Sequence, residues 1–255
     1  MKAYAVTDVG RSRSMNQDSV FASVDPVGPL SNLYMVADGM GGHQSGDLAS
    51  RYLVRNLCTY IRETDGEPPE VLLRAVQQVN GELYQLSTEK PEYAGMGTTL
   101  VAATVKEGVL YVANVGDSRL YLVRRDGLKQ VTRDHSFVEE MVSMGRMERG
   151  SQSYLEKKNI ITRAVGIDRR VEVDLFEVEL EEGDYILLCS DGLSNMVDNT
   201  DLFRLSFLPG SLEKKAEAMV TLANERGGRD NISVVLVEIE PEEGAGCCEA
   251  VWICR

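Results

Sequence analysis

The amino-acid sequence predicts an α+β fold, arranged in layers and built on mainly antiparallel sheets. Most apolar runs are short and either alternate with polar residues or are continuous, which is typical of strands. Some neighbouring runs are separated only by short glycine-containing segments, at 106–108 and 125–127, which favours hairpins. Two longer segments with helical spacing follow each other directly. A consecutive pair of helices indicates packing on antiparallel sheets instead of alternating βαβ units.

The apolar pattern assigns the elements in chain order. Strands are predicted at residues 3–7, 19–24, 33–37, 98–105, 109–115, 120–123, 128–132, 171–178, 185–189 and 232–239. Helices are predicted at 46–63, at 69–88, where Pro69 suits a first helical turn, and at 212–225. A polar stretch at about 134–166 carries one short helical signal at 137–144, and such an insertion is typical either of a functional lid or of a surface excursion. We expect one domain at 1–240 and a flexible tail at 241–255.

Composition excludes several classes of protein. The 255 residues include 40 acidic and 27 basic side chains, for a net charge of -13. This balance argues against binding to nucleic acid or to an anionic membrane, although it also suits any protein kept in solution by its charge. Five cysteines do not form a disulfide framework, and two histidines, His43 and His135, are too few for an all-histidine metal site. No stretch approaches the roughly 20 apolar residues of a membrane span, so we expect a cytoplasmic protein.

Aspartates lie next to the ends of several predicted strands. Asp38 and Asp191 each follow an apolar run and precede a glycine, Asp18 and Asp230 each precede a strand, and Asp117 lies in a turn. Strand ends share a rim in a sheet domain, so these carboxylates can converge, and their repulsion would then require cations. Mg²⁺ and Mn²⁺ prefer oxygen ligands, and a pair of such ions commonly serves phosphate ester hydrolysis. Each aspartate alone is more typical of a turn or cap, so the prediction depends on the whole set.

Six ordered strings carry a resemblance to a known family. They are Thr7-Asp8-Val9-Gly10 with Arg13-Ser14-Met15-Asn16-Gln17-Asp18, Val36-Ala37-Asp38-Gly39-Met40-Gly41-Gly42-His43, Gly97-Thr98-Thr99, Asn114-Val115-Gly116-Asp117-Ser118-Arg119, Cys189-Ser190-Asp191-Gly192-Leu193 and Arg229-Asp230-Asn231-Ile232-Ser233. Together they resemble the bacterial branch of the protein phosphatase 2C family over about residues 3–240, and six strings in order are far more specific than one motif.

The resemblance implies an α-β-β-α sandwich of two mainly antiparallel sheets flanked by helices, with metals in a cleft at one end. Asp38 would bridge two metals, Gly39 would bind through its carbonyl, and Asp18 would act through a water. Asp191 and Asp230 would complete the set. Asp117, with Asp191, matches a weaker third site. Arg13 matches the arginine that binds the substrate phosphate, for which a planar guanidinium suits bidentate contact.

The resemblance also implies the reaction and its partners. The reaction would be hydrolysis of phosphoserine and phosphothreonine in proteins, by in-line attack of a hydroxide that bridges two Mn²⁺ or Mg²⁺ ions, without a covalent phosphoenzyme. A third ion would bind more weakly. The segment at about 134–166 would be the flap that meets the phosphoprotein. We also expect a cognate Ser/Thr kinase, a monomeric state, and no nucleic-acid or membrane partner.

The sequence departs from the family pattern at two positions. Met40 replaces the histidine of the animal members, which is a candidate general acid, so the proton for the leaving group would come from water or another residue. His43 is close in sequence but is equally typical of a loop histidine. Gln17 replaces the glutamate of many relatives and removes one charge from the metal surroundings.

Other functions find less support in the sequence. Neither Cys58 nor Cys189 has the Cys-x₅-Arg arrangement of a cysteine phosphatase, and no serine-hydrolase, P-loop or zincin motif occurs. A metal-dependent nuclease could use similar aspartates, but the chain has no basic stripe. The main alternative is a pseudophosphatase that keeps the fold as a binding or sensing module. Such a protein typically loses a bridging aspartate or the phosphate arginine, and Asp38 and Arg13 are both present.

Overall fold

The computed structural model describes residues 1–41 and 45–240, so His43 and the expected tail at 241–255 lie outside the described residues. The strands are β1 Lys2–Asp8, β2 Asp18–Ser23, β3 Leu33–Met40, β4 Gly97–Thr98, β5 Leu100–Lys106, β6 Val109–Val115, β7 Arg119–Arg124, β8 Gly127–Gln130, β9 Asp174–Glu179, β10 Tyr185–Cys189 and β11 Ile232–Glu238. The helices are α1 Ser45–Arg62, α2 Pro68–Glu89, α3 Phe137–Ser143, α4 Gln152–Lys157, α5 Asp191–Ser194, α6 Asn199–Ser206, α7 Leu212–Glu225 and the 3₁₀ turn η1 Pro91–Tyr93.

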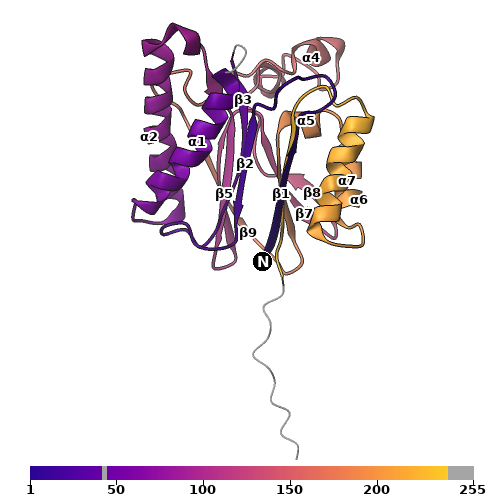
Figure 1. Ribbon diagram of the computed structural model, residues 1–255. Coiled ribbons are helices and arrows are strands. Elements are labelled where there is room, and N and C mark those ends of the chain that lie inside the picture. Colours follow the sequence, from indigo (N-terminus) through magenta and orange to yellow (C-terminus); the bar gives the residue numbers. More distant parts are fainter. Residues whose placement is uncertain (42–44, 241–255) are drawn as a thin grey trace, which may run out of the picture.

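Two antiparallel sheets form the centre of the molecule. One sheet has the strand order β1-β11-β10-β7-β8, and the other has the order β2-β3-β5-β6-β9, with β4 paired to β3. Figure 1 shows α1 and α2 on the outer side of the second sheet, and α6 and α7 on the outer side of the first. The predicted α+β fold, a layered α-β-β-α sandwich, is therefore confirmed.

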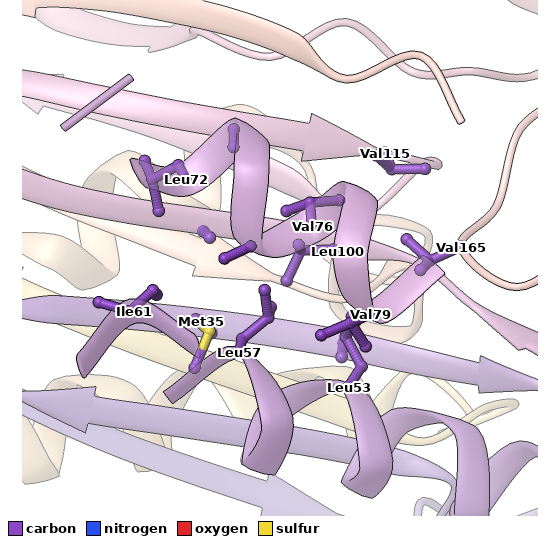
Figure 2. Packing of buried hydrophobic residues seen from close by; sticks show 14 of the residues in the cluster. Met35, Leu53, Leu57, Ile61, Leu72, Val76, Val79, Leu100, Val115 and Val165 are labelled. Carbon is purple, nitrogen blue, oxygen red and sulfur yellow. The ribbon is translucent and has the colours of Figure 1, made fainter. Parts of the chain in front are cut away.

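Alternation along the strands builds three apolar layers. Along β3, Leu33 and Met35 face α1 and α2, whereas Tyr34 and Val36 face the other sheet, because successive side chains of a strand point to opposite faces. Figure 2 shows the first layer, in which side chains of α1 and α2 such as Leu53 and Val76 pack over the sheet. A matching layer joins α6 and α7 to the first sheet. Each fully buried Leu or Val stabilises the fold by about 1.5–3 kcal/mol.

Two local differences from the predicted elements bear on the site. The strand predicted at 98–105 is divided at Thr99, whose main-chain N–H donates to the Asp38 carbonyl at 2.9 Å and whose hydroxyl lies 2.7 Å from that of Ser118. The short β4 also extends β3 as far as Met40, so Asp38 lies inside a strand and not directly after one. The sequence pattern missed α4, α5 and α6, because helices of four to eight residues are too short to show a clear period.

The segment at 134–166 crosses one end of the sandwich. It carries α3 and α4 and is fastened at both ends by isolated bridges, Ser136 to Ile161 and Thr98 to Val165. In Figure 1, α4 lies above the strand ends, close to α5. Among the described residues, no helix combines the length and apolar character needed to cross a bilayer.

Candidate metal-binding active site

Asp18 and Asp38 face each other across the β2–β3 ladder, in direct register. Asp18 is buried, and its Oδ2 accepts hydrogen bonds from the hydroxyls of Ser190 at 2.8 Å and Ser233 at 2.7 Å. Ser233 lies in β11 of the other sheet and Ser190 follows β10 of that sheet, so the carboxylate links the two sheets. Its Oδ1 is buried without a hydrogen-bond partner among the described residues.

The backbone around Asp38 is held on both sides. Its N–H donates to the Thr99 hydroxyl at 2.9 Å, and its carbonyl accepts from the Thr98 hydroxyl and the Thr99 N–H, each at 2.9 Å. The next residue, Gly39, has no room for a side chain, because a Cβ there would lie 2.0 Å from the carbonyl oxygen of Gly46. Glycine at this position therefore lets the start of α1 approach the strand that carries Asp38.

Asp191 follows a strand of the first sheet, and Asp117 lies in a turn that connects the two sheets. Asp191 is the first residue of α5, two residues after the end of β10, and its Oδ2 accepts from the Asn195 side chain at 2.9 Å. Asp117 lies in the turn between β6 and β7, after Gly116, whose φ of +104° lies in the region that favours glycine. One oxygen of each carboxylate, Oδ1, is buried and has no hydrogen-bond partner in the described part of the chain.

Arg13 reaches the site from the loop between β1 and β2. Its guanidinium donates to Asp230 Oδ2 at 2.8 Å, and its side chain is 52% exposed. The loop is fastened to the segment that carries Asp230, because the N–H groups of Arg11 and Ser12 donate to the Gly228 carbonyl at 2.7 and 3.1 Å. An arginine on a fixed loop with an exposed end can reach an anion bound beside the carboxylates.

One cavity of about 280 Å³ collects most of the predicted site residues. The predicted residues that line it are Arg13, Asp38, Gly39, Asp117, Asp191 and Asp230. Asp18 does not line the cavity; it lies behind Asp38 in the adjacent strand. Asn159 and Ile161, from the segment at 134–166, close one side.

The carboxylates of this group are costly to ionise without compensating positive charge. Burial raises the pKa of Asp18, Asp38, Asp117 and Asp191 above the usual range, and repulsion from neighbouring carboxylates raises each of them further. Of the described residues, Arg13 is the only cation that lines the cavity. One guanidinium cannot offset this number of acidic groups, so the site favours additional cations.

The donor set fits divalent cations that bind oxygen. Within residues 1–41 and 45–240, no three acidic, histidine or cysteine side chains already form a closed metal cage. The fit rests instead on the buried, unpartnered Oδ1 atoms of Asp18, Asp117 and Asp191, which belong to three different strand ends. A buried carboxylate oxygen without a donor costs free energy, and a hard cation such as Mn²⁺ or Mg²⁺ would satisfy it.

The sequence pattern missed the residues that hold the site together. The clearest is Asn231, whose Oδ1 accepts from the Gln17 N–H and whose Nδ2 donates to the carbonyls of Val9 and Met15, all at 2.9 Å. This side chain therefore fixes the loop that carries Arg13. Asn231 stands next to Asp230 in the last of the six family strings. The sequence gives no sign of its role, because its three hydrogen-bond partners lie more than 210 residues away.

Comparison with known proteins agrees with this geometry. The family model described as "Protein phosphatase 2C" matches residues 9–231. The serine/threonine phosphatase stp of Listeria monocytogenes is 42% identical over 245 residues, which cover 93% of this chain and 96% of that protein. The solved serine/threonine phosphatase of S. agalactiae superposes with a TM-score of 0.88 at 37% identity, covering 94% of this chain and 99% of that one. The catalytic domain of the phosphatase PstP, solved with two manganese ions, gives a TM-score of 0.82 at 33% identity, covering 94% and 98%.

Proposed function

The chain belongs to the protein phosphatase 2C family, and we propose that the cavity between Arg13, Asp38 and Asp191 is where it hydrolyses phosphoproteins. The protein is a metal-dependent serine/threonine protein phosphatase. The pseudophosphatase alternative has no support, because the relatives are named as phosphatases and the carboxylates and the arginine are all present. The observation that carries the proposal is the set of buried carboxylate oxygens beside this cavity that have no hydrogen-bond partner in residues 1–41 and 45–240.

The aspartates of the cavity are the proposed metal ligands. Asp38, the Gly39 carbonyl, Asp191 and Asp230 would hold two ions, with Asp18 contributing from behind through a water. Asp117 would hold a third, weaker ion together with Asp191. The related PstP catalytic domain was solved with two manganese ions, which supports a pair of bound ions, and the choice between Mn²⁺ and Mg²⁺ is part of the proposal. When bound, such cations lower the pKa of water and offset the charge of the phosphate.

The protein side chains orient the phosphate and keep the reaction non-covalent. Arg13 would leave Asp230 and donate to two phosphate oxygens, which its exposure permits. Neither described cysteine lines the cavity, and burial raises the pKa of Cys189 to about 12, so it does not supply a thiolate nucleophile. Met40, which lines the cavity, carries no proton to donate, so the leaving alkoxide oxygen of the substrate would take its proton from water or another residue.

The surroundings of the cavity suggest how a phosphoprotein is received. We propose that the segment at 134–166 is the flap that contacts the substrate, since its Asn159 and Ile161 line the cavity. We also propose that residues 1–240 form the catalytic domain, that a cognate Ser/Thr kinase opposes it, and that the protein is a cytoplasmic monomer. The net charge of -13 favours protein substrates over nucleic acid or anionic membranes.

Hydrolysis of p-nitrophenyl phosphate and of a phosphothreonine peptide tests the proposal. We expect turnover with Mn²⁺, loss of turnover when EDTA removes the metal, and recovery when excess Mn²⁺ is returned. The matched control is Asp38→Asn, which keeps the shape of the side chain but removes its charge. A wild type with no more activity than this variant would show that the cavity is not an active site.

A further inference from the structure

A chain of two hydrogen bonds runs from the segment at 134–166 to one of the proposed metal ligands. Lys158, directly after α4, donates from Nζ to Asn195 Oδ1 at 2.7 Å. Asn195, directly after α5, donates from Nδ2 to Asp191 Oδ2 at 2.9 Å. All three residues line a polar cavity of about 200 Å³ that also borders Asp117 and so adjoins the active site.

The lysine sets the direction of this chain. A side-chain amide can turn over and exchange its oxygen and nitrogen, but an ammonium group can only donate. Lys158 must therefore face the amide oxygen of Asn195, which leaves the NH₂ group to face Asp191. The backbone of Asn195 is also fixed, because its N–H donates to the Asp191 carbonyl at 2.8 Å. Without the lysine, the Asn195 amide would lose the contact that holds its oxygen, and the side chain would orient Asp191 less firmly.

The direction of the amide decides which oxygen of Asp191 is available. Its Oδ2 is occupied by Asn195, while its Oδ1 is buried and has no hydrogen-bond partner among the described residues. The carboxylate is thus held with one specific oxygen toward the cations. Groups that orient a metal ligand in this way typically change metal affinity or activity by about 10- to 100-fold when they are removed.

The contact to Asn195 is the only hydrogen bond of the Lys158 side chain within residues 1–41 and 45–240, and it forms no ion pair there. The side chain is half-buried, and its positive charge faces the carboxylate of Asp191. Its neighbour Lys157 is exposed and contacts the ring of Phe137 instead. The two adjacent lysines therefore differ in the one contact that reaches the active site.

We propose that Lys158 and Asn195 are positioning residues through which the 134–166 segment controls the orientation of Asp191, and hence the affinity of the cations that Asp191 binds. The inference rests on the proposed metal site. It makes the segment and the cation interdependent, because a contact that strengthens cation binding is itself strengthened by the bound cation. A substrate that displaces the segment would lower the affinity for the cation that Asp191 binds, and a substrate that presses the segment onto the site would raise that affinity.

Mn²⁺ titrations test the inference on the intact protein, with free Mn²⁺ followed by electron paramagnetic resonance. Lys158→Met keeps the length of the side chain and removes its donor, and we expect about a tenfold increase in the Kd of the weakest Mn²⁺ site. Lys157→Met is the matched control and should leave this Kd unchanged. In an Asn195→Ala background, Lys158→Met should have no further effect, because the two residues act through one chain. In EDTA, the Tm of Lys158→Met should fall by no more than the roughly 2–4 °C expected for one lost hydrogen bond, which separates the effect from a loss of folding.

A second readout follows the segment itself. We expect Mn²⁺ to slow amide hydrogen exchange at residues 152–160 in the wild type and to slow it less in Lys158→Met. Three results would each overturn the inference while the proposed function stands. The Mn²⁺ Kd of Lys158→Met could equal that of Lys157→Met, or the effects of Lys158→Met and Asn195→Ala could add in full. Amide exchange at 152–160 could also be the same with and without Mn²⁺. A wild type that binds no Mn²⁺ would overturn both.

Discussion

Removal of the Asn231 side chain should loosen the loop that carries Arg13 and destabilise the fold. Asn231 is only 4% exposed, and Asn231→Ala deletes its hydrogen bonds to the Gln17 N–H and to the carbonyls of Val9 and Met15. Each such bond contributes about 1 kcal/mol, so losing the three of them costs about 3 kcal/mol of unfolding free energy. For a domain of this size, that loss lowers Tm by about 6–12 °C.

The same variant should bind phosphate less well. A mobile Arg13 loop weakens ground-state contact with the substrate, so KM for p-nitrophenyl phosphate should rise more than kcat falls. Asn231→Asp should be at least as harmful as Asn231→Ala, because it keeps the acceptor for Gln17 but cannot donate to the two carbonyls. Asn199→Ala, an exposed asparagine on α6, is the matched control and should behave as wild type.

Differential scanning calorimetry measures the expected fall in Tm, and steady-state kinetics measure the expected rise in KM. An Asn231→Ala variant that unfolds within about 1 °C of the Asn199→Ala control would contradict the predicted loss of stability, because such a shift corresponds to well under 1 kcal/mol. An Asn231→Asp variant as stable as the wild type would contradict it as well, since the two donated hydrogen bonds would then contribute nothing.

Three other variants test the packing beside Asp38, the proposed phosphate contact and the pH dependence of stability. Gly39→Ala places a Cβ 2.0 Å from a main-chain oxygen at the start of α1, so we expect both a lower Tm and nearly complete loss of phosphatase activity. Arg13→Ala should raise KM for the phosphate ester if the arginine binds the ground state, or lower kcat if its contact tightens in the transition state, and unchanged values of both would remove Arg13 from the site. His135 Nδ1 accepts from the Gly116 N–H at 3.0 Å, so the ring is neutral, and burial lowers the pKa of His135. Its folded pKa lies below the unfolded value of about 6.5, so its contribution to stability is present above that pH and is lost as the pH falls below it. Urea unfolding at pH 7.5 and 5.5 should therefore show a larger loss for the wild type than for His135→Asn, which can still accept from Gly116.

The aspartates could be found from sequence because each stands in a short string with its own signal. Asp38 and Asp191 follow apolar runs and precede glycines, and the structure places both beside one cavity. Lys158 and Asn195 have no such signal, since a lysine in a polar stretch and an asparagine after a short helix are ordinary surface residues. Only their mutual contact and their contact with Asp191 distinguish them.

The strands, the longer helices and the candidate ligands could be predicted from the amino-acid sequence, because periodicity and turn chemistry act between residues that are close along the chain. Which side chains contact one another depends on how the two sheets and their helices pack. Asp18 accepts hydrogen bonds from Ser190 and Ser233, 172 and 215 positions away, and one oxygen of its carboxylate is left for a cation. No local pattern encodes that geometry, since it arises only when the two sheets pack face to face.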